Sequence, residues 1–584
     1  MNISGYTPST GLTATVANEL IQSLYGNSNT QALSHIETSL YYYVKLVEKS
    51  NNSNVIELYA VDKTTGLAYK ASEIPTEEYV IFGGTDSSTG KTIYVSKTSN
   101  KDTNGTIFKQ QVSKLLTDNP TYKVLKVGTN YTGKLQIKNS GLESIKDATE
   151  LFKDLNKLTT IQIYGKFAPT AMLRTFMNCN ALTALNFSNI DTSQVTTMAQ
   201  CFEKCHVMEN FDFVSKWNTK KVANMSGMFE TCKEITSIPT IDMTNVTIAQ
   251  YMFSNCSKLA TITPNIIGQK IQSAIGMFNN CIKLNLDKIK DFTTIFGHNS
   301  NLTNVSGLFK GCTTLTDVGT HNVFDVDDSA GYPELKINAT KANNQLFTYC
   351  PNITNMSSIF MNCTNLGNNV NNCGIPMGLF YNCHKLTNIS HAFDGCKHIT
   401  VNKEASISIG VELCNVLFVN NPELVDVSYL FANVTTDFIG ENTQNPNLLF
   451  PVQTKIQNAS YLWKNCNMTE TFGYETIPFI YKSKVLKNIE GMFQGQTYAR
   501  ILPSMGGEYD VPAYDWSKLD TICPALENCS KLFDGNTNLT DGNGGTATKM
   551  INSLKKIKTL TNHAEAFKGC TKLSDYNSIP ADWK

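Results

Sequence analysis

The chain has 584 residues, more than one conventional globular core holds, which predicts several domains or one elongated array. Its 49 basic and 49 acidic residues leave a formal net charge of zero, and charged residues make up only 17% of the total. This balance argues against a nucleic-acid-binding protein, which needs a basic face to displace counterions from phosphates, and against a polybasic membrane anchor.

The hydrophobic pattern argues against membrane insertion as well. No stretch reaches the roughly 18 uninterrupted apolar residues that a membrane-spanning helix requires. The first residues also lack a basic segment followed by an apolar run, so we expect no secretory signal.

Residues 1–140 predict a small α+β domain. Helical periodicity predicts helices at 12–26, 31–49 and 108–116. Alternating apolar residues and turn signals predict a hairpin around the turn DKTTG and further strands, at 54–61, 66–72, 77–84, 91–97, 121–128 and 133–139. Arrays of repeats need terminal caps, so we expect this domain to cap the open end of an array or to dock it to another protein.

From about residue 150 onward a tetrad, Phe-x-x-Cys, recurs along the chain. It begins at Phe176, Phe202, Phe229, Phe253, Phe278, Phe309, Phe347, Phe360, Phe380, Phe393 and Phe567, with Trp463 as a variant. Copies without the thiol occur at Phe152, Phe296, Phe418, Phe431, Phe493 and Phe533. A unit repeated about 18 times predicts a solenoid over residues 141–584, and solenoids generally present extended binding surfaces.

One repeat unit predicts a strand, a turn and a short helix. Leu182, Leu185 and Phe187 alternate as in a short strand, and the turn residues SNIDTSQ follow. Val195, Met198 and Phe202 are three and four residues apart, which predicts the inner face of a helical turn.

The spacing of the aromatic residues is regular only in the first part of the array. Up to about residue 290 they are 24 to 27 residues apart, and later many are 13 apart. We interpret the 13-residue steps as half-units. Insertions are expected to loop out on one face, at 316–345, 434–459 and 497–528.

The chain has 17 cysteines, and 12 of them occupy the same position of the repeat. A free cysteine behaves as a small buried hydrophobe, so we expect a row of reduced, buried thiols, with neither disulfides nor zinc sites. Reduced thiols predict folding in a reducing compartment.

Several segments resemble the BspA-like leucine-rich repeats of bacterial surface proteins. SHAFDGCKHI at 390–399 and AEAFKGCTKL at 564–573 match one form of that repeat, and segments 186–205 and 216–232 match the other. The resemblance covers about 150–584. It implies a leucine-rich-repeat fold and a role in adhesion to host proteins or other cells, and similar repeats occur in some virion proteins. It transfers no catalytic residues.

The sequence contains no nucleophile elbow, metalloprotease helix or phosphate-binding loop, so we expect no enzyme activity and no cofactor. His384, His391 and His398 are seven residues apart and are expected to be ordinary surface residues rather than metal ligands. The acidic cluster Asp325, Asp327 and Asp328 predicts a solvated loop, with a loose calcium site as the alternative.

One polar column is a candidate binding site. An Asn or Asp recurs two residues after the Leu-type position, where it is expected to point outward from the strand face and to bind a glycan or a peptide. The column comprises Asn210, Asn304, Asp317, Asn355, Asn388, Asp426, Asp541 and Asp575. Alternatively, each of these side chains closes its own backbone turn or pairs with its neighbour.

Together these features predict a non-enzymatic recognition or adhesion protein. The first hypothesis is a tail or fibre component of a bacteriophage virion, made in the cytoplasm, that binds a glycan or protein of the host surface through the repeats. Its N-terminal domain would then contact other virion subunits. A bacterial or protist cell-surface adhesin is the alternative, and a purely structural virion subunit also remains open.

Overall fold

A computed structural model describes residues 145–584 with internal gaps, and before residue 145 it describes the strands alone. The gaps are 263–267, 288, 290, 297–298, 320–323, 328–333, 338–344, 369–375, 377, 400–416, 419, 435–454, 467–470, 473–483, 497–499, 502–503, 506–513 and 542–543. The chain forms two compact units, Met1–Ile235 with Pro239–Asp242 and Met243–Lys584 with Thr236–Ile238, and each is described separately.

The N-terminal strands form two antiparallel sheets. The first has the order β1-β2-β3-β4 and consists of β1 (Thr30–Glu37), β2 (Tyr41–Glu48), β3 (Asn51–Asp62) and β4 (Ala68–Lys70). The second has the order β6-β5-β7 and consists of β5 (Tyr79–Asp86), β6 (Thr92–Thr98) and β7 (Tyr122–Thr129). These elements confirm the predicted hairpin and strands.

The helix predicted over 31–49 is wrong, because β1 and β2 form an antiparallel pair there. The segment contains the run Tyr41 to Val44, and aromatic and β-branched residues fit a pleated sheet better than a helix. The helices predicted at 12–26 and 108–116 lie outside the described residues.

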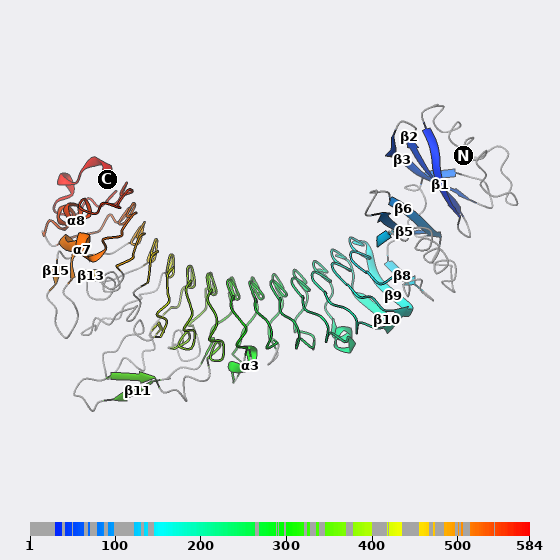
Figure 1. The fold of residues 1–584 in the computed structure, drawn as a ribbon, viewed down its shortest axis with the longest axis horizontal. Helices are drawn as coiled ribbons and strands as arrows, with labels where there is room; N and C mark the ends of the chain where they lie inside the picture. The colour runs from blue at the N-terminus through cyan, green and yellow to red at the C-terminus, as the bar shows by residue number, and fades with distance from the viewer. Residues whose placement is uncertain are drawn as a thin grey trace. The chain divides into compact units, whose positions relative to one another are not determined.

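A parallel sheet of order β10-β9-β8 begins the repeats (Figure 1). It comprises β8 (Gly133–Ile137), β9 (Leu158–Phe167) and β10 (Ala184–Ile190). Leu185 pairs with Ile161 and is buried, whereas Asn186 beside it is exposed. The strand predicted around 182–187 is therefore confirmed, and its alternation places apolar residues inward.

The helical turn predicted over 195–202 is wrong, although Val195, Met198 and Phe202 are buried as expected. The chain forms a ribbon of turns in which Gln200 and Lys204 have φ of 55° and 62°. Left-handed residues at this interval are incompatible with a right-handed helix. Every second backbone N–H group therefore donates a hydrogen bond to a backbone carbonyl of the next repeat unit, as Phe176 N does to Cys201 O at 2.8 Å.

We call each ribbon, from its bridge residue to its Cys position (171–179 for example), a rung. Rungs keep the same backbone bonds whatever length of chain separates them. The N–H groups of Val305, Gly307, Phe309 and Gly311 all bond carbonyls of the rung 355–363. The thiol contact between these two rungs joins residues 54 apart in sequence, against 34 for the preceding pair of rungs. The intervening residues must therefore loop out, as predicted.

The segments between the rungs carry small elements of their own. They comprise α3 (Thr293–Phe296), β11 (Phe324–Asp327), β12 (Glu334–Ile337), β13 (Thr471–Phe472), β14 (Arg500–Ile501), β15 (Ser504–Met505) and β16 (Tyr514–Asp515). Two predicted insertions extend too far, because residues 458–459 and residue 528 belong to rungs. η2 (Asp212–Lys216) lies between two rungs of the first unit.

Within each unit, aromatic residues of successive rungs stack on one another and form the core. Phe176 lies 5.1 Å from Phe152 and 5.4 Å from Phe202 between ring centroids. Some repeat units carry a second stack, in which Phe380 and Phe418 are 5.6 Å apart. Aromatic residues 13 apart in sequence therefore occupy the two stacks of one repeat unit, which agrees with the half-unit interpretation.

The C-terminal part adds short helices around the last rungs (Figure 1). They are η4 (Trp516–Lys518), α7 (Leu519–Ile522), α8 (Thr546–Leu554), η5 (Tyr576–Ser578) and η6 (Ala581–Trp583). Trp583 O accepts a hydrogen bond from Phe567 N at 2.8 Å, and the Trp583 ring stacks on His563 at 4.3 Å. η6 therefore covers the last rung. None of the described helices has the length and apolar composition needed to cross a bilayer.

Candidate functional site

A row of Asn and Asp side chains runs along successive rungs of the second unit. Parallel β-bridges join each residue of the row to the next. We call this row the Asn ladder: Asn304, Asn355, Asn388, Asp426, Asn458, Asn488, Asn528 and Asn562. Asn562 is exposed and the other members are half-buried, so one edge of each side chain reaches solvent.

Each ladder side chain closes its own backbone turn. Asn388 Oδ1 accepts a hydrogen bond from Ser390 N at 2.9 Å and from Ser390 Oγ at 2.8 Å. The other members accept in the same way from the N–H two residues further on. The turn-closing alternative is therefore confirmed. Binding of a glycan or peptide by this column stays a prediction.

The turn leaves the amide nitrogens available. Within the described part of the chain, Nδ2 forms no hydrogen bond in Asn304, Asn355, Asn388, Asn458 and Asn488. Because Oδ1 is fixed by the turn, each Nδ2 has a fixed direction. The ladder therefore presents oriented donors one rung apart.

The other predicted column residues lie elsewhere. Asn210 Oδ1 accepts from Asp212 N at 2.6 Å, and Asp317 Oδ1 accepts from Val318 N at 2.8 Å, both outside the ladder. Asp541 and Asp575 accept from Thr546 N and Thr548 N at the start of α8, at 3.1 and 2.6 Å. Asp541 is also buried, so its predicted outward position on a strand face is wrong.

Carboxylates at a helix N-terminus satisfy N–H groups that lack partners within the helix, and they complement its dipole. Asp541 and Asp575 therefore cap α8. The sequence column placed Asp541 and Asp575 together with the ladder residues because the same spacing, Phe-x-x-Cys-x-x-Leu-x-Asn, occurs in both halves of a repeat unit. Only the copies in one half lead into the ladder.

Four members of the ladder were missed because no recognised copy of the tetrad, with or without the thiol, precedes them at that spacing. They are Asn458, Asn488, Asn528 and Asn562, and Asn224 takes the equivalent place in the first unit. A different count finds all of them. Each lies five residues before the ring of its rung, as Asn458 does before Trp463 and Asn488 before Phe493.

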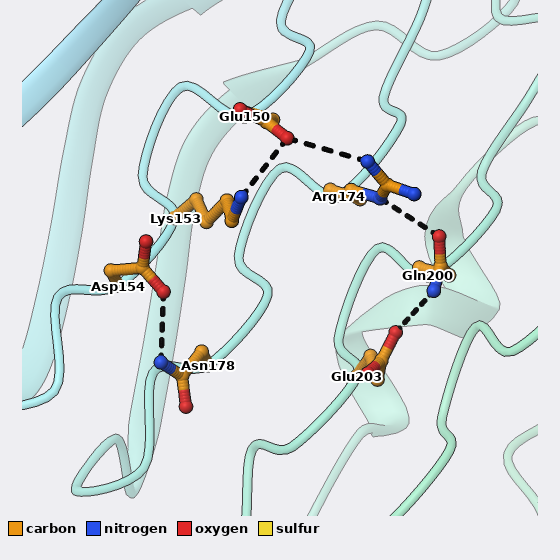
Figure 2. Close-up of polar contacts among 7 residues, drawn as sticks. All are labelled: Glu150, Lys153, Asp154, Arg174, Asn178, Gln200 and Glu203. Carbon is orange, nitrogen blue, oxygen red and sulfur yellow. Dashed lines mark hydrogen bonds and ion pairs between the residues drawn. The ribbon is translucent and has the colours of Figure 1, made fainter.

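The first left-handed position of each rung holds a second column. In the first unit, Arg174 Nε donates to Gln200 Oε1 at 2.8 Å, and Arg174 Nη1 lies 3.5 Å from Glu150 Oε1. Figure 2 shows this chain continuing from Gln200 to Glu203, with the Asp154–Asn178 contact at a separate place. Polar side chains thus link neighbouring rungs of the first unit.

In the second unit, three rungs carry stacked rings in the same column. His391 and Tyr429 are 4.3 Å apart between centroids, and Tyr429 and Tyr461 are 4.6 Å apart. His391 Nδ1 lies 2.9 Å from Asp394 Oδ2, and Tyr461 Oη donates to Glu490 Oε1 at 2.7 Å. Burial raises the pKa of Tyr429, and the carboxylates of Glu490 and Asp394 raise it further.

The 15 described cysteines are free and buried, which confirms the predicted thiols; Cys373 and Cys414 lie outside the described residues. Most of the rung thiols also donate to the carbonyl of the preceding ring residue, as Cys281 Sγ does to Phe253 O at 3.1 Å. Burial raises the pKa of Cys281 to about 12. Where an Asn replaces the Cys, its amide donates the equivalent hydrogen bond, as Asn421 Nδ2 donates to Phe380 O.

The candidate metal ligands remain scattered. His384 is exposed, His391 is paired with Asp394, and Asp325 and Asp327 lie in β11. Asp328 lies outside the described residues. Among the residues that are described, no three His, Cys, Asp or Glu side chains converge as a metal site requires.

Comparison with known proteins gives a family match for part of the chain. Residues 170–292 and 303–408 match the family described as "Mycoplasma protein of unknown function, DUF285", whose members carry the BspA-like repeat. No curated protein matches the chain.

A crystal structure of a leucine-rich repeat protein from Bacteroides ovatus ATCC 8483 also matches. It is 16% identical and covers 65% of this chain and 91% of its own, with a TM-score of 0.25. A superposition this loose supports no argument about the present protein. The family match confirms the predicted resemblance to the BspA-like repeats over residues 170–292 and 303–408.

Proposed function

We propose that this protein is a non-enzymatic recognition or adhesion protein whose Asn ladder contacts a glycan or protein on another surface. The observation that carries the proposal is the unbroken series of ladder residues, joined by bridges and held at one orientation. A binding surface gains affinity when its polar groups are already fixed, because little side-chain entropy is lost on binding.

The chemistry of the ladder favours a neutral, polar partner. The chain has no net charge, and the ladder contains amides with Asp426 as its one carboxylate. An amide nitrogen recognises hydroxyl and carbonyl oxygens, and many weak hydrogen bonds along a row add up when a partner engages them together.

We further propose that the repeats form a solenoid, which the common register of backbone bonds between rungs supports. Residues 1–140 would form an α+β domain that caps its open end or docks it to other subunits of an assembly. A solenoid with one face of regular polar rungs suits an extended partner.

The finer proposal is a tail or fibre component of a bacteriophage virion. The support is chemical, because 15 buried free thiols fit a protein that folds under reducing conditions and is released within a particle. Mass spectrometry of purified virions from the same source tests this. Recovery of the chain in cell envelopes alone would favour a surface adhesin.

Asn→Asp exchanges test the ladder because Asp keeps the Oδ1 acceptor that closes the turn. We expect N388D/N458D to melt within a few degrees of the wild type and to attach to target cells at least about tenfold more weakly, since two oriented donors become acceptors. Unchanged attachment would move the binding surface to the insertions.

A further inference from the structure

Three consecutive rungs of the second unit differ from the others in two independent ways. Their first left-handed positions hold His391, Tyr429 and Tyr461, whose rings form one continuous stack. The ladder residue of the middle rung is Asp426, the one carboxylate in a row of amides. Both features therefore occur on the same three rungs.

The stack ends at the next rung, which has a glycine, Gly491, at the position of the rings. Gly491 has φ of 51°, and a Cβ there would fall inside van der Waals contact with the Tyr461 ring. Glu490 fixes the position of Tyr461 at this end of the stack, because its two carboxylate oxygens accept hydrogen bonds from Tyr461 Oη at 2.7 Å and from Asn528 Nδ2 at 3.1 Å. The rings are thus held in place from both the stack and the next rungs.

The polar groups beside the stack alternate in character. Asp426 Oδ1 accepts from Ser428 N at 2.9 Å, and its second oxygen forms no hydrogen bond within the described residues. On the rungs to either side, the Nδ2 groups of Asn388 and Asn458 are equally without partners there. A donor, an acceptor and a donor therefore follow one another at rung spacing, and the half-buried Tyr429 lies three residues after Asp426 on the middle rung.

This pattern restricts the ligand. An extended peptide presents groups on one side only every second residue, about 6.8 Å apart, whereas bonded backbone segments lie about 4.8 Å apart. The stacked rings, 4.3 and 4.6 Å apart, follow the shorter spacing. Three carboxylates lie on these rungs and the next, Asp394, Asp426 and Glu490, against one ammonium group, Lys464 Nζ at 5.1 Å from the Tyr461 ring, so the balance of charge disfavours an anionic polymer. Closely spaced hydroxyl groups, each both donor and acceptor, fit the pattern.

Resting on the proposed function, we propose that Asn388, Asp426, Asn458 and the His391–Tyr429–Tyr461 stack form a subsite for a neutral saccharide. Asp426 accepts from a sugar hydroxyl, the flanking amides donate to neighbouring oxygens, and the ring edges pack against the carbon atoms of the sugar. The rest of the ladder extends the contact.

The test is an array of immobilised neutral and anionic oligosaccharides, probed with the labelled full chain. D426N keeps the turn acceptor and removes the charge, and Y429F removes one hydroxyl group. The matched control is D317N, the same exchange outside the ladder. Equal melting temperatures establish that all variants are folded.

We expect the wild type and D317N to retain neutral oligosaccharides and D426N to bind them at least about tenfold more weakly, as loss of a hydrogen bond to a charged group implies. Y429F keeps the ring that packs against the sugar, so it should bind them like the wild type. Wild-type chain that retains no neutral oligosaccharide, or D426N that binds like the wild type, overturns the subsite. If the wild-type chain retains no neutral oligosaccharide but still attaches to cells, and N388D/N458D does not attach, the partner is a protein and the proposed function stands.

Discussion

Replacing Asn388 by Ala should destabilise its rung, whereas Asp should largely preserve it. Ser390 is 8% exposed, and both its N–H and its hydroxyl donate to Asn388 Oδ1. Alanine leaves these buried donors without an acceptor, which costs about 1–3 kcal/mol. Asp keeps the acceptor and adds repulsion with Asp426 on the next rung, about 0.2–1 kcal/mol. We therefore expect stability in the order Asn, Asp, Ala.

Hydrogen exchange of the Ser390 amide measures this effect locally, and it suits an array whose unfolding need not be two-state. Protection should fall by about tenfold or more in N388A and much less in N388D. Equal protection in both variants would refute the turn-closing role. For the same reason, alanine is a poor choice for testing binding by the ladder, because it changes stability and recognition together.

Three further predictions concern packing and ionisation. G491A should lower the free energy of unfolding by about 1–2 kcal/mol because Ala is strained in the left-handed backbone, and by more because its Cβ displaces the Tyr461 ring. In a double-mutant cycle of melting temperatures, Y461A/G491A should not show the part of the loss that comes from this displacement. F360A, which removes a ring stacked between Phe309 and Phe393, should cost about 3–5 kcal/mol in denaturant titrations. Burial raises the pKa of the Cys281 thiol to about 12, so its contribution to the free energy of unfolding is complete below pH 9 and falls by about 1.4 kcal/mol per pH unit as the pH rises toward 12. C281S should therefore lose less stability at alkaline pH than the wild type. Identical pH profiles of stability would contradict this.

Much of the repeat fold could be predicted from the sequence, because the aromatic and thiol positions report burial directly. Phe176 and Cys179 are buried as expected, and the half-unit spacing agrees with the two ring stacks. The backbone of the rung could not be predicted. Apolar residues at spacings of three and four fit a helix and a ribbon of turns equally, and only the left-handed residues, such as Gln200, separate them.

The candidate site was predicted in part. Asn304, Asn355, Asn388 and Asp426 do share one row, but the spacing after Leu also selected Asp541, which caps a helix. The sequence could not separate these roles, because the same local motif occurs in both halves of a repeat unit. Asp541 accepts from Thr546 N, five residues further on, and Asp575 accepts from Thr548 N, so both roles follow from α8, a helix that the sequence analysis did not predict.

Attachment of the full chain to target cells, compared between N388D/N458D and N362D, tests the central claim most directly. Asn362 is exposed at the second left-handed position of its rung, where Asn and Asp are both tolerated, so the control makes the same chemical change away from the ladder. The ladder account predicts that N362D attaches like the wild type and that N388D/N458D attaches at least about tenfold more weakly. Equal attachment by all three chains would contradict it.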